Sequence, residues 1–144
     1  MICAGAGVAP FIGFVAHRAE QLRRDSSLCA GPVVLYVGCR SEEHQPYTVD
    51  TKDVVDVRYA YSQDTKGFGG YVQDRVWAER DEFTALWERG ARVYVCGSQG
   101  VSLGVKEVVR RIYRGWGAGG EKTEEEVEAW WVEILRERYV VDVF

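Results

Sequence analysis

Apolar residues are spaced in two alternating ways along this chain, one typical of buried strands and the other of helices that bury a single face. Short apolar runs predict five strands, at residues 1–3, 33–38, 54–62, 92–97 and 139–144. Between them, apolar residues recur every three or four positions and predict helices at residues 10–24, 71–78, 82–89, 101–112 and 123–135. The polar connection at 41–52 is expected to be a loop with at most one helical turn.

The alternation of strands and helices places the chain in the α/β class. Strands joined through helices pair in parallel by right-handed crossovers, so we expect one doubly wound, parallel sheet of about five strands with helices on both faces. With 144 residues the chain is long enough for a core of its own, and we treat residues 1–144 as one domain. Ligands of such sheets bind beyond the carboxyl ends of the strands, and we expect one cleft to gather residues from all five ends.

The stretch that opens the chain has the composition of a phosphate-binding turn. A short apolar strand runs into Gly5 and Gly7, and Pro10 follows at a place suited to the first turn of a helix. Glycines let the backbone turn sharply and approach a ligand closely, and a helix N-terminus behind such a turn attracts anions. The spacing G-x-G-x-x-P lacks the third glycine of the common dinucleotide fingerprint, so a tight turn without a ligand is the alternative interpretation.

Composition and charge exclude several function classes. A formal net charge of -4 argues against a nucleic-acid-binding surface, and no run approaches the roughly 18 apolar residues of a membrane span. No signal sequence opens the chain, so we expect a cytoplasmic segment. We expect reduced thiols and no metal site, because the cysteines show no C-x-x-C spacing and the two histidines lie in stretches that favour exposure. These residues are Cys3, Cys29, Cys39, Cys96, His17 and His44.

Five short motifs follow one another along the chain. They are Gly5-Ala6-Gly7-Val8-Ala9-Pro10-Phe11, Gly38-Cys39-Arg40, Tyr71-Val72-Gln73, Val95-Cys96-Gly97 and Asp142-Val143-Phe144. In this order they resemble the G-T-G-[IV]-A-P-F, G-C-R, Y-V-Q, V-C-G and final D-V-W motifs of the NADPH-binding domain of diflavin reductases, the family of cytochrome P450 reductase. The approach through Cys3 and the terminal Phe144 look most like the reductase part of fungal self-sufficient fused P450s.

The resemblance implies an oxidoreductase in which NADPH passes a hydride to FAD, FAD reduces FMN, and FMN delivers single electrons to a haem protein such as a cytochrome P450. This chain would hold the NADPH. The residues assigned to the pyrophosphate and the nicotinamide side are Gly5, Ala6, Gly7 and Val8, with Gly97 as a further cofactor contact. Those assigned to the adenosine and its 2′-phosphate, or close to them, are Arg40, Ser62, Gln63, Lys66, Tyr71 and Gln73.

The same resemblance gives three residues a part in hydride transfer. Cys96 and Asp142 would lie beside the nicotinamide, where they position the ring and stabilise developing charge. Phe144 would stack on the FAD ring and move aside for the nicotinamide, a role suited to an aromatic residue at a mobile terminus. Without that family context, a cysteine at a strand end is more often a small packing residue, a terminal phenylalanine a core residue, and an aspartate near a terminus a solvated acid.

The chain departs from the family pattern where the cofactor is held. Ala6 stands in place of a threonine and removes a hydroxyl, whose hydrogen bond is typically worth about 0.5–1.5 kcal/mol. Gln63 stands where the family has arginine and Gly69 where it has lysine, so two cations expected at the 2′-phosphate are missing. Lys66 and Arg40 can compensate in part, and we expect a weakened preference for NADPH over NADH.

No stretch resembles the FAD-binding barrel, the FMN domain or a haem-binding segment of such reductases. We therefore expect the chain to be a C-terminal fragment of a longer FAD/FMN reductase, or a protein whose other domains lie on separate chains. Its expected partners are those flavin domains and a haem protein, and attachment of the parent to a membrane stays open. Two alternatives also stay open: a single-flavin reductase of the ferredoxin-NADP or cytochrome b5 reductase type, and a dinucleotide-binding remnant without turnover.

Overall fold

The computed structural model describes residues 1–25, 31–46, 54–63, 69–117 and 119–144. These residues form one five-stranded sheet of order β3-β2-β1-β4-β5, in which neighbouring strands are parallel. The strands are β1 (Ile2–Ala4), β2 (Val34–Cys39), β3 (Asp56–Tyr61), β4 (Val93–Gly97) and β5 (Tyr139–Val143). The predicted α/β fold is confirmed, and each predicted strand end lies within two residues of the observed one.

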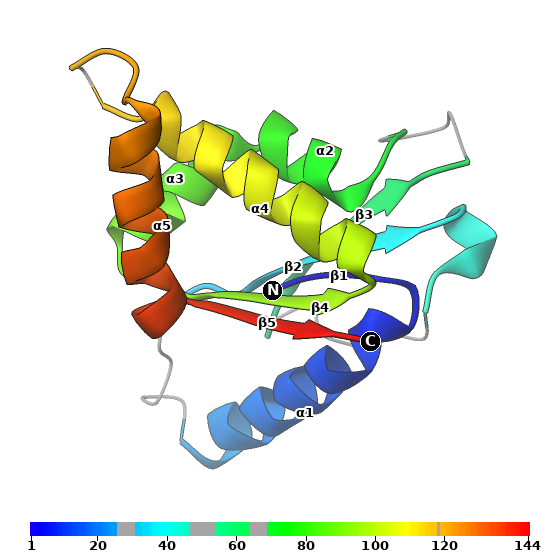
Figure 1. Ribbon diagram of the computed structural model, residues 1–144. Helices are drawn as coiled ribbons and strands as arrows, with labels where there is room; N and C mark the ends of the chain where they lie inside the picture. The colour runs from blue at the N-terminus through cyan, green and yellow to red at the C-terminus, as the bar shows by residue number, and fades with distance from the viewer. Residues whose placement is uncertain (26–30, 47–53, 64–68, 118) are drawn as a thin grey trace.

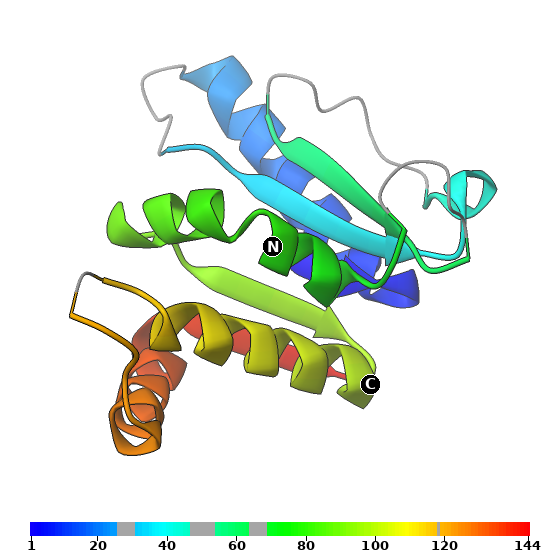
Figure 2. The ribbon, with the colours of Figure 1, turned by 90° about the horizontal axis from the view of Figure 1, so that it is seen from above.

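Helices cover both faces of the sheet (Figure 1). Helix α1 (Ala9–Arg24) lies on one face, and α2 (Val72–Ala78) and α4 (Gln99–Arg114) pack against each other on the opposite face. The view from above shows these two helices side by side over the strands (Figure 2). Helix α3 (Arg80–Glu88) follows α2, and α5 (Glu124–Glu137) leads into β5. Two 3-10 turns, η1 (Gly5–Val8) and η3 (Glu42–His44), follow β1 and β2.

Local sequence accounts for where the helices begin. Pro10 stands in the first turn of α1, where its missing N–H leaves no hydrogen bond unmade. The Ser98 hydroxyl accepts a hydrogen bond from the Val101 N–H at 3.4 Å and caps α4. Thr123 and Glu126 form the predicted capping box of α5, with each side chain accepting from the other residue's N–H. These residues set the points at which α1, α4 and α5 begin.

The sheet divides the core into two layers. On one side Ile2 and the inner faces of β2 and β4 pack against α2, α4 and α5, with Val105 among the fully buried residues. On the other side Cys3 and Cys96 pack in a cluster with Phe11 and Val15 of α1. Cys3 and Cys96 are partners across β1 and β4, and alternate strand residues point to opposite faces, so both thiols point toward α1. In the described part of the chain, no helix combines the length and apolarity needed to cross a membrane.

Candidate functional site

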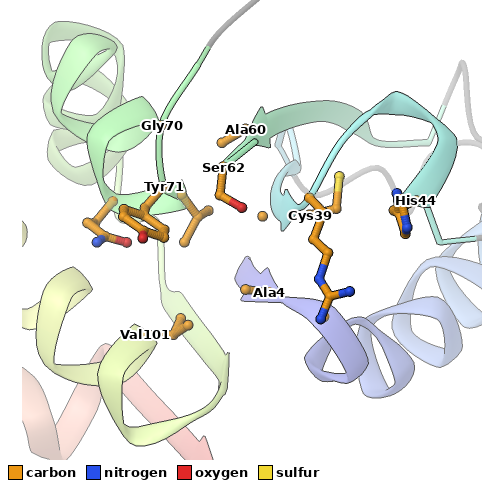
Figure 3. Close-up of a pocket in the computed structure, with 13 residues that line it drawn as sticks. Ala4, Cys39, His44, Ala60, Ser62, Gly70, Tyr71 and Val101 are labelled. Carbon is orange, nitrogen blue, oxygen red and sulfur yellow. The ribbon is translucent and has the colours of Figure 1, made fainter. Parts of the chain in front are cut away.

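A cleft of about 390 Å³ opens at the carboxyl edge of the sheet (Figure 3). Its walls come from the last residues of β1, β2 and β3 and those that follow them, from the start of α2, and from Val101 of α4. Five of the predicted cofactor residues line it: Gly5, Arg40, Ser62, Tyr71 and Gln73. The structure thus brings together residues from several separate segments of the sequence.

Backbone pairing beyond the sheet places the polar residues of the cleft. The N–H of Ser62 donates to the carbonyl of Cys39 at 2.9 Å, and the N–H of Gln63 donates to the carbonyl of Arg40 at 2.8 Å. The segments after β2 and β3 therefore continue side by side past the last residue of each strand. This arrangement sets the Arg40 and Ser62 side chains on the same cleft.

Tyr71 is held at the N-terminus of α2. Its N–H donates to the Asp74 carboxylate at 2.8 Å, and the N–H of Gly70 donates to the carbonyl of Tyr61 at 3.0 Å. Gly70 has a φ of +123°, a conformation that side chains rarely adopt, and it turns the chain from the end of β3 into the helix. The Tyr71 residue is 63% exposed and lies along the cleft wall (Figure 3). Its ring offers a flat apolar surface on which a heteroaromatic base can stack.

Small residues let the helices approach the cleft. A Cβ on Gly38 would lie 3.1 Å from the Ala4 Cβ and 3.2 Å from the Val72 Cβ, so any side chain there would displace α2 from the strand ends. A Cβ on Gly104 of α4 would lie 3.0 Å from the Gln73 amide carbon. The close contact of α2 and α4 that these glycines permit holds the Gln73 amide at the cleft.

The two glycines of the opening turn have different surroundings. Gly5 has a φ of +56°, in the left-handed region, and a Cβ on it would meet no atom within 4 Å. Gly7 is buried, and a Cβ on it would lie 2.2 Å from the carbonyl oxygen of Cys96. The η1 turn therefore packs directly on β4 through Gly7, while Gly5 faces the cleft. Val8 is 6% exposed and packs in the cluster with Phe11 and Val15 of α1, whereas Ala6 is exposed.

The three residues expected at the nicotinamide do not line this cleft. Cys96 and Asp142 are paired across β4 and β5, and Cys96 is 3% exposed in the layer under α1. The N–H of Phe144 donates to the carbonyl of Gly97 at 3.4 Å, and Phe144 itself is 69% exposed. These residues lie at the same carboxyl edge, but Cys96 and Asp142 point to the α1 face and the cleft opens on the α2–α4 face.

The expectation that one cleft gathers all five strand ends is therefore corrected. The cleft takes its walls from the ends of β1, β2 and β3, and the ends of β4 and β5 contribute none of its residues. The physical reason is the strand order, because β4 and β5 lie on the other side of β1 from β2 and β3. A ligand that meets both groups of residues has to extend across the carboxyl edge over β1.

Burial decides the protonation of the thiols near this edge. Burial raises the pKa of the Cys96 thiol, and the negative charge of Asp142 raises it further. Burial likewise raises the pKa of the Cys39 thiol, whose Sγ lies 3.6 Å from the carbonyl oxygen of Ser41. Both cysteines are therefore neutral thiols at physiological pH. Cys96 can contact a ring by packing and as a weak donor, but it does not act as a thiolate nucleophile.

Comparison with known proteins identifies the family. The profile of the oxidoreductase NAD-binding domain matches residues 1–107, well over half of the chain. This chain belongs to that family. Membership explains why the glycine turn and the polar strand ends gather at the carboxyl edge, where α/β sheets of this kind bind dinucleotides.

The relatives of this NAD-binding domain are fusions of a P450 with a reductase. The chain is 37% identical over 153 residues to a self-sufficient cytochrome P450 monooxygenase of Exserohilum turcicum, with 100% of this chain and 14% of the relative covered. It is 37% identical over 153 residues to a bifunctional cytochrome P450/NADPH–P450 reductase of Acremonium egyptiacum, with the same coverage. A bifunctional cytochrome P450/NADPH–P450 reductase of Fusarium oxysporum is 36% identical over 153 residues, with 99% and 14% covered.

The chain spans 14% of the length of these curated relatives. An NAD-binding oxidoreductase domain within such a fusion belongs to its NADPH–P450 reductase portion, so the resemblance to that reductase is confirmed. A nicotinamide dinucleotide is accordingly the cofactor class of this domain.

The other predicted cofactor residues lie outside the cleft. Gln63 is exposed next to Ser62, and Gly97 is buried at the end of β4. Lys66 lies outside the described residues. The roles of all these residues stay predictions.

The sequence analysis missed one titratable residue of the cleft, His44. It lies on η3, is exposed as expected, and lines the cleft close in sequence to Arg40. Its Nδ1 lies 2.8 Å from the Ser41 Oγ. The S-x-x-H spacing, which puts a hydroxyl and an imidazole on one helical turn, is the signal that points to this arrangement.

Proposed function

We propose that this chain binds NADPH and positions it for hydride transfer to FAD in a reductase that supplies electrons to a haem protein. The observation that carries the proposal is the cleft at the carboxyl edge in a member of the NAD-binding oxidoreductase family. The cleft combines a glycine turn, a guanidinium, a hydroxyl, an amide and an exposed phenol ring. These groups match the phosphates, the ribose and the base of a dinucleotide.

The adenosine half of the cofactor fits the cleft. The Tyr71 ring stacks on the adenine, and Arg40 provides a permanent positive charge for phosphate oxygens. Ser62 and Gln73 supply the hydrogen-bond donors that complete the shell. Gly5, at the rim of the cleft, lets the backbone of the opening turn approach the pyrophosphate without a Cβ in between.

The nicotinamide half lies at the ends of β4 and β5. An extended dinucleotide leaves the cleft over β1 and arrives on the α1 face, where the pair of Cys96 and Asp142 points. The neutral thiol of Cys96 packs against the ring, and the exposed Asp142 carboxylate orients it and stabilises the positive charge that develops as the hydride leaves. Phe144 covers the flavin side until the nicotinamide displaces it. FAD, when bound by its own domain, accepts the hydride there.

An uncovered apolar surface supports the placement of a flavin domain at this face. Phe14 of α1 and Val140 of β5 are each 52% exposed. Tyr94 lies between them, with its ring centroid 6.1 Å from that of Phe14 and with Val140 as its strand partner. This surface continues to Asp142 along the same side of β5. Exposed apolar groups beside a proposed reaction site favour burial against another domain.

A chimera tests the proposal. This chain replaces the aligned segment of the Fusarium oxysporum relative, and the loss of flavin absorbance is followed after mixing with NADPH. We expect flavin reduction, and we expect Asp142→Asn to slow it by at least about tenfold because a charge facing the nicotinamide is lost. Glu137→Gln, at the last residue of α5 and close to the amino end of β5, is the matched control and should leave the rate unchanged. A chimera that retains its FAD but whose flavin stays oxidised with both NADPH and NADH would contradict the proposal.

A further inference from the structure

We propose that His44 donates a hydrogen bond from Nε2 to the 2′-phosphate of NADPH and so contributes to the preference of this chain for NADPH over NADH. The inference rests on the proposed function, because it assigns a further residue to the same cleft. His44 lines the cleft together with Arg40 and Ser62. Figure 3 shows His44 and Tyr71 toward opposite ends of the cavity, with Ser62 and Cys39 between them.

Arg40 is the one permanent cation among the described residues that line the cleft. Gln63 and Gly69 stand where the resemblance leads us to expect arginine and lysine. A phosphate monoester carries a charge of about -1.5 to -2 at neutral pH and three acceptor oxygens, which one guanidinium does not saturate. The His44 ring is a further lining group of the described part that can donate a hydrogen bond to such an oxygen.

The local geometry holds the imidazole by one nitrogen and leaves the other for a ligand. The Ser41 Oγ lies 2.8 Å from Nδ1, and a hydroxyl can donate a hydrogen bond to that nitrogen. Nε2 makes no hydrogen bond within the described residues. When Nδ1 accepts from Ser41, Nε2 carries the ring hydrogen, so Nε2–H is free to donate to a phosphate oxygen.

Calorimetric titration tests this role. 2′,5′-ADP and 5′-AMP are titrated into the chain, and the ratio of their dissociation constants measures recognition of the 2′-phosphate. We expect His44→Ala to lower the preference for 2′,5′-ADP by about fivefold, the size of one lost hydrogen bond. His17→Ala, which changes the one other histidine at an exposed position of α1, should keep the wild-type preference.

The outcomes distinguish this inference from the function on which it rests. Binding of both nucleotides with a preference that His44→Ala leaves unchanged would overturn the role of His44 and leave the proposed function standing. Absence of binding of either nucleotide at millimolar concentration would overturn the two together. Because His44 is exposed on a short turn, His44→Ala is expected to fold, and its circular dichroism spectrum should match that of the wild type.

Discussion

Gly5 and Gly7 are two positions apart, yet an added side chain would clash with neighbouring atoms at Gly7 and not at Gly5. The surroundings of Gly7 are backbone atoms of β4, which cannot move aside as a flexible side chain can. Around Gly5 there is open space, and only its positive φ disfavours a side chain. Nothing in the G-x-G spacing distinguishes these roles, because both glycines fit a phosphate turn equally well. The difference arises from the packing of the η1 turn on a strand that lies far away in the sequence.

Gly7→Ala should destabilise the chain by about 3 kcal/mol, since the added methyl overlaps the Cys96 carbonyl and forces η1 away from β4. Gly5→Ala, the matched control, should cost about 1 kcal/mol through its left-handed backbone alone. Urea unfolding of the three proteins measures both values. Equal stability of Gly7→Ala and the wild type would show that η1 does not pack on β4 in this way.

Because the thiol of Cys3 is buried, we expect the chain to lose stability at alkaline pH. Burial raises the pKa of its thiol to about 12. The unfolded chain releases this proton near pH 8.5, so the folded state binds more protons above that pH, and the free energy of unfolding falls as the pH rises toward 12. The stability is undiminished below about pH 8, and the loss reaches up to about 5 kcal/mol as the pH approaches 12. Unfolding of Cys3→Ala should depend less steeply on pH over this range; an equally steep profile would exclude Cys3 as the cause.

The residue at position 63 is expected to affect the preference for a nucleotide that carries a 2′-phosphate. Its N–H donates to the Arg40 carbonyl, so a longer cationic side chain at this position would start beside Arg40. Gln63→Arg should raise the preference for 2′,5′-ADP over 5′-AMP by about fivefold through a second charge at the phosphate. Gln21→Arg, on the exposed surface of α1, adds the same charge far from the cleft and should have no effect. A strong wild-type preference that Gln63→Arg fails to increase would contradict the account of the missing cations.

Between elements, one arginine joins a strand to the helices above it. Arg58 of β3 donates to Glu79 and to Glu82, where α2 meets α3, and to Asp56 of its own strand at 2.6 Å. Burial alone would raise the pKa of Glu79, but hydrogen bonds from Arg58 and Arg75 lower it overall. The Arg58 side chain is 14% exposed, so this ion pair is little screened by solvent. It ties the edge strand β3 to the helical segment whose first residues form the cleft.

Arg58→Met should lower the free energy of unfolding by about 2 kcal/mol, less than for a fully buried pair because Glu82 and Asp56 are half exposed. Arg23→Met removes a pair with Glu20 from the surface of α1, where the arginine side chain is 73% exposed, and should change stability by no more than about 0.5 kcal/mol. Chemical denaturation compares the two variants. The prediction fails if Arg58→Met unfolds at the same denaturant concentration as Arg23→Met.

At this scale the sequence predicts more of the fold than of the site. The spacing of apolar residues along the chain directly predicts the strands and helices. The η3 turn lies in the connection at 41–52, for which we expected at most one helical turn. The face toward which a strand-end residue points depends on the phase of the pleat and on the neighbouring strands. For that reason Cys96 and Arg40 were expected around one cleft, although Cys96 packs under α1. His44 was missed because its place in the cleft depends on how a polar loop folds back.

The candidate site residues of the whole domain lie along the carboxyl edge of the sheet, but on both of its faces. The cleft that we propose for the adenosine half faces α2 and α4, and the proposed hydride-transfer side faces α1, with β1 and the opening turn between them. A dinucleotide that crosses this edge places its two ends in different surroundings, one within the chain and one beside an uncovered apolar surface. The chain spans 14% of the length of its fused relatives, and that surface is where we place the flavin domain.

Amide chemical shifts of the isotope-labelled chain, followed during titration with NADP⁺, test this central claim most directly. We predict that shifts at Gly38, Arg40 and Ser62 and shifts at Cys96 and Gly97 change together and saturate with one dissociation constant, because one ligand spans both faces. Amides at the amino ends of the strands should not move. The absence of any change at millimolar NADP⁺, or changes confined to residues away from the carboxyl edge, would contradict the account.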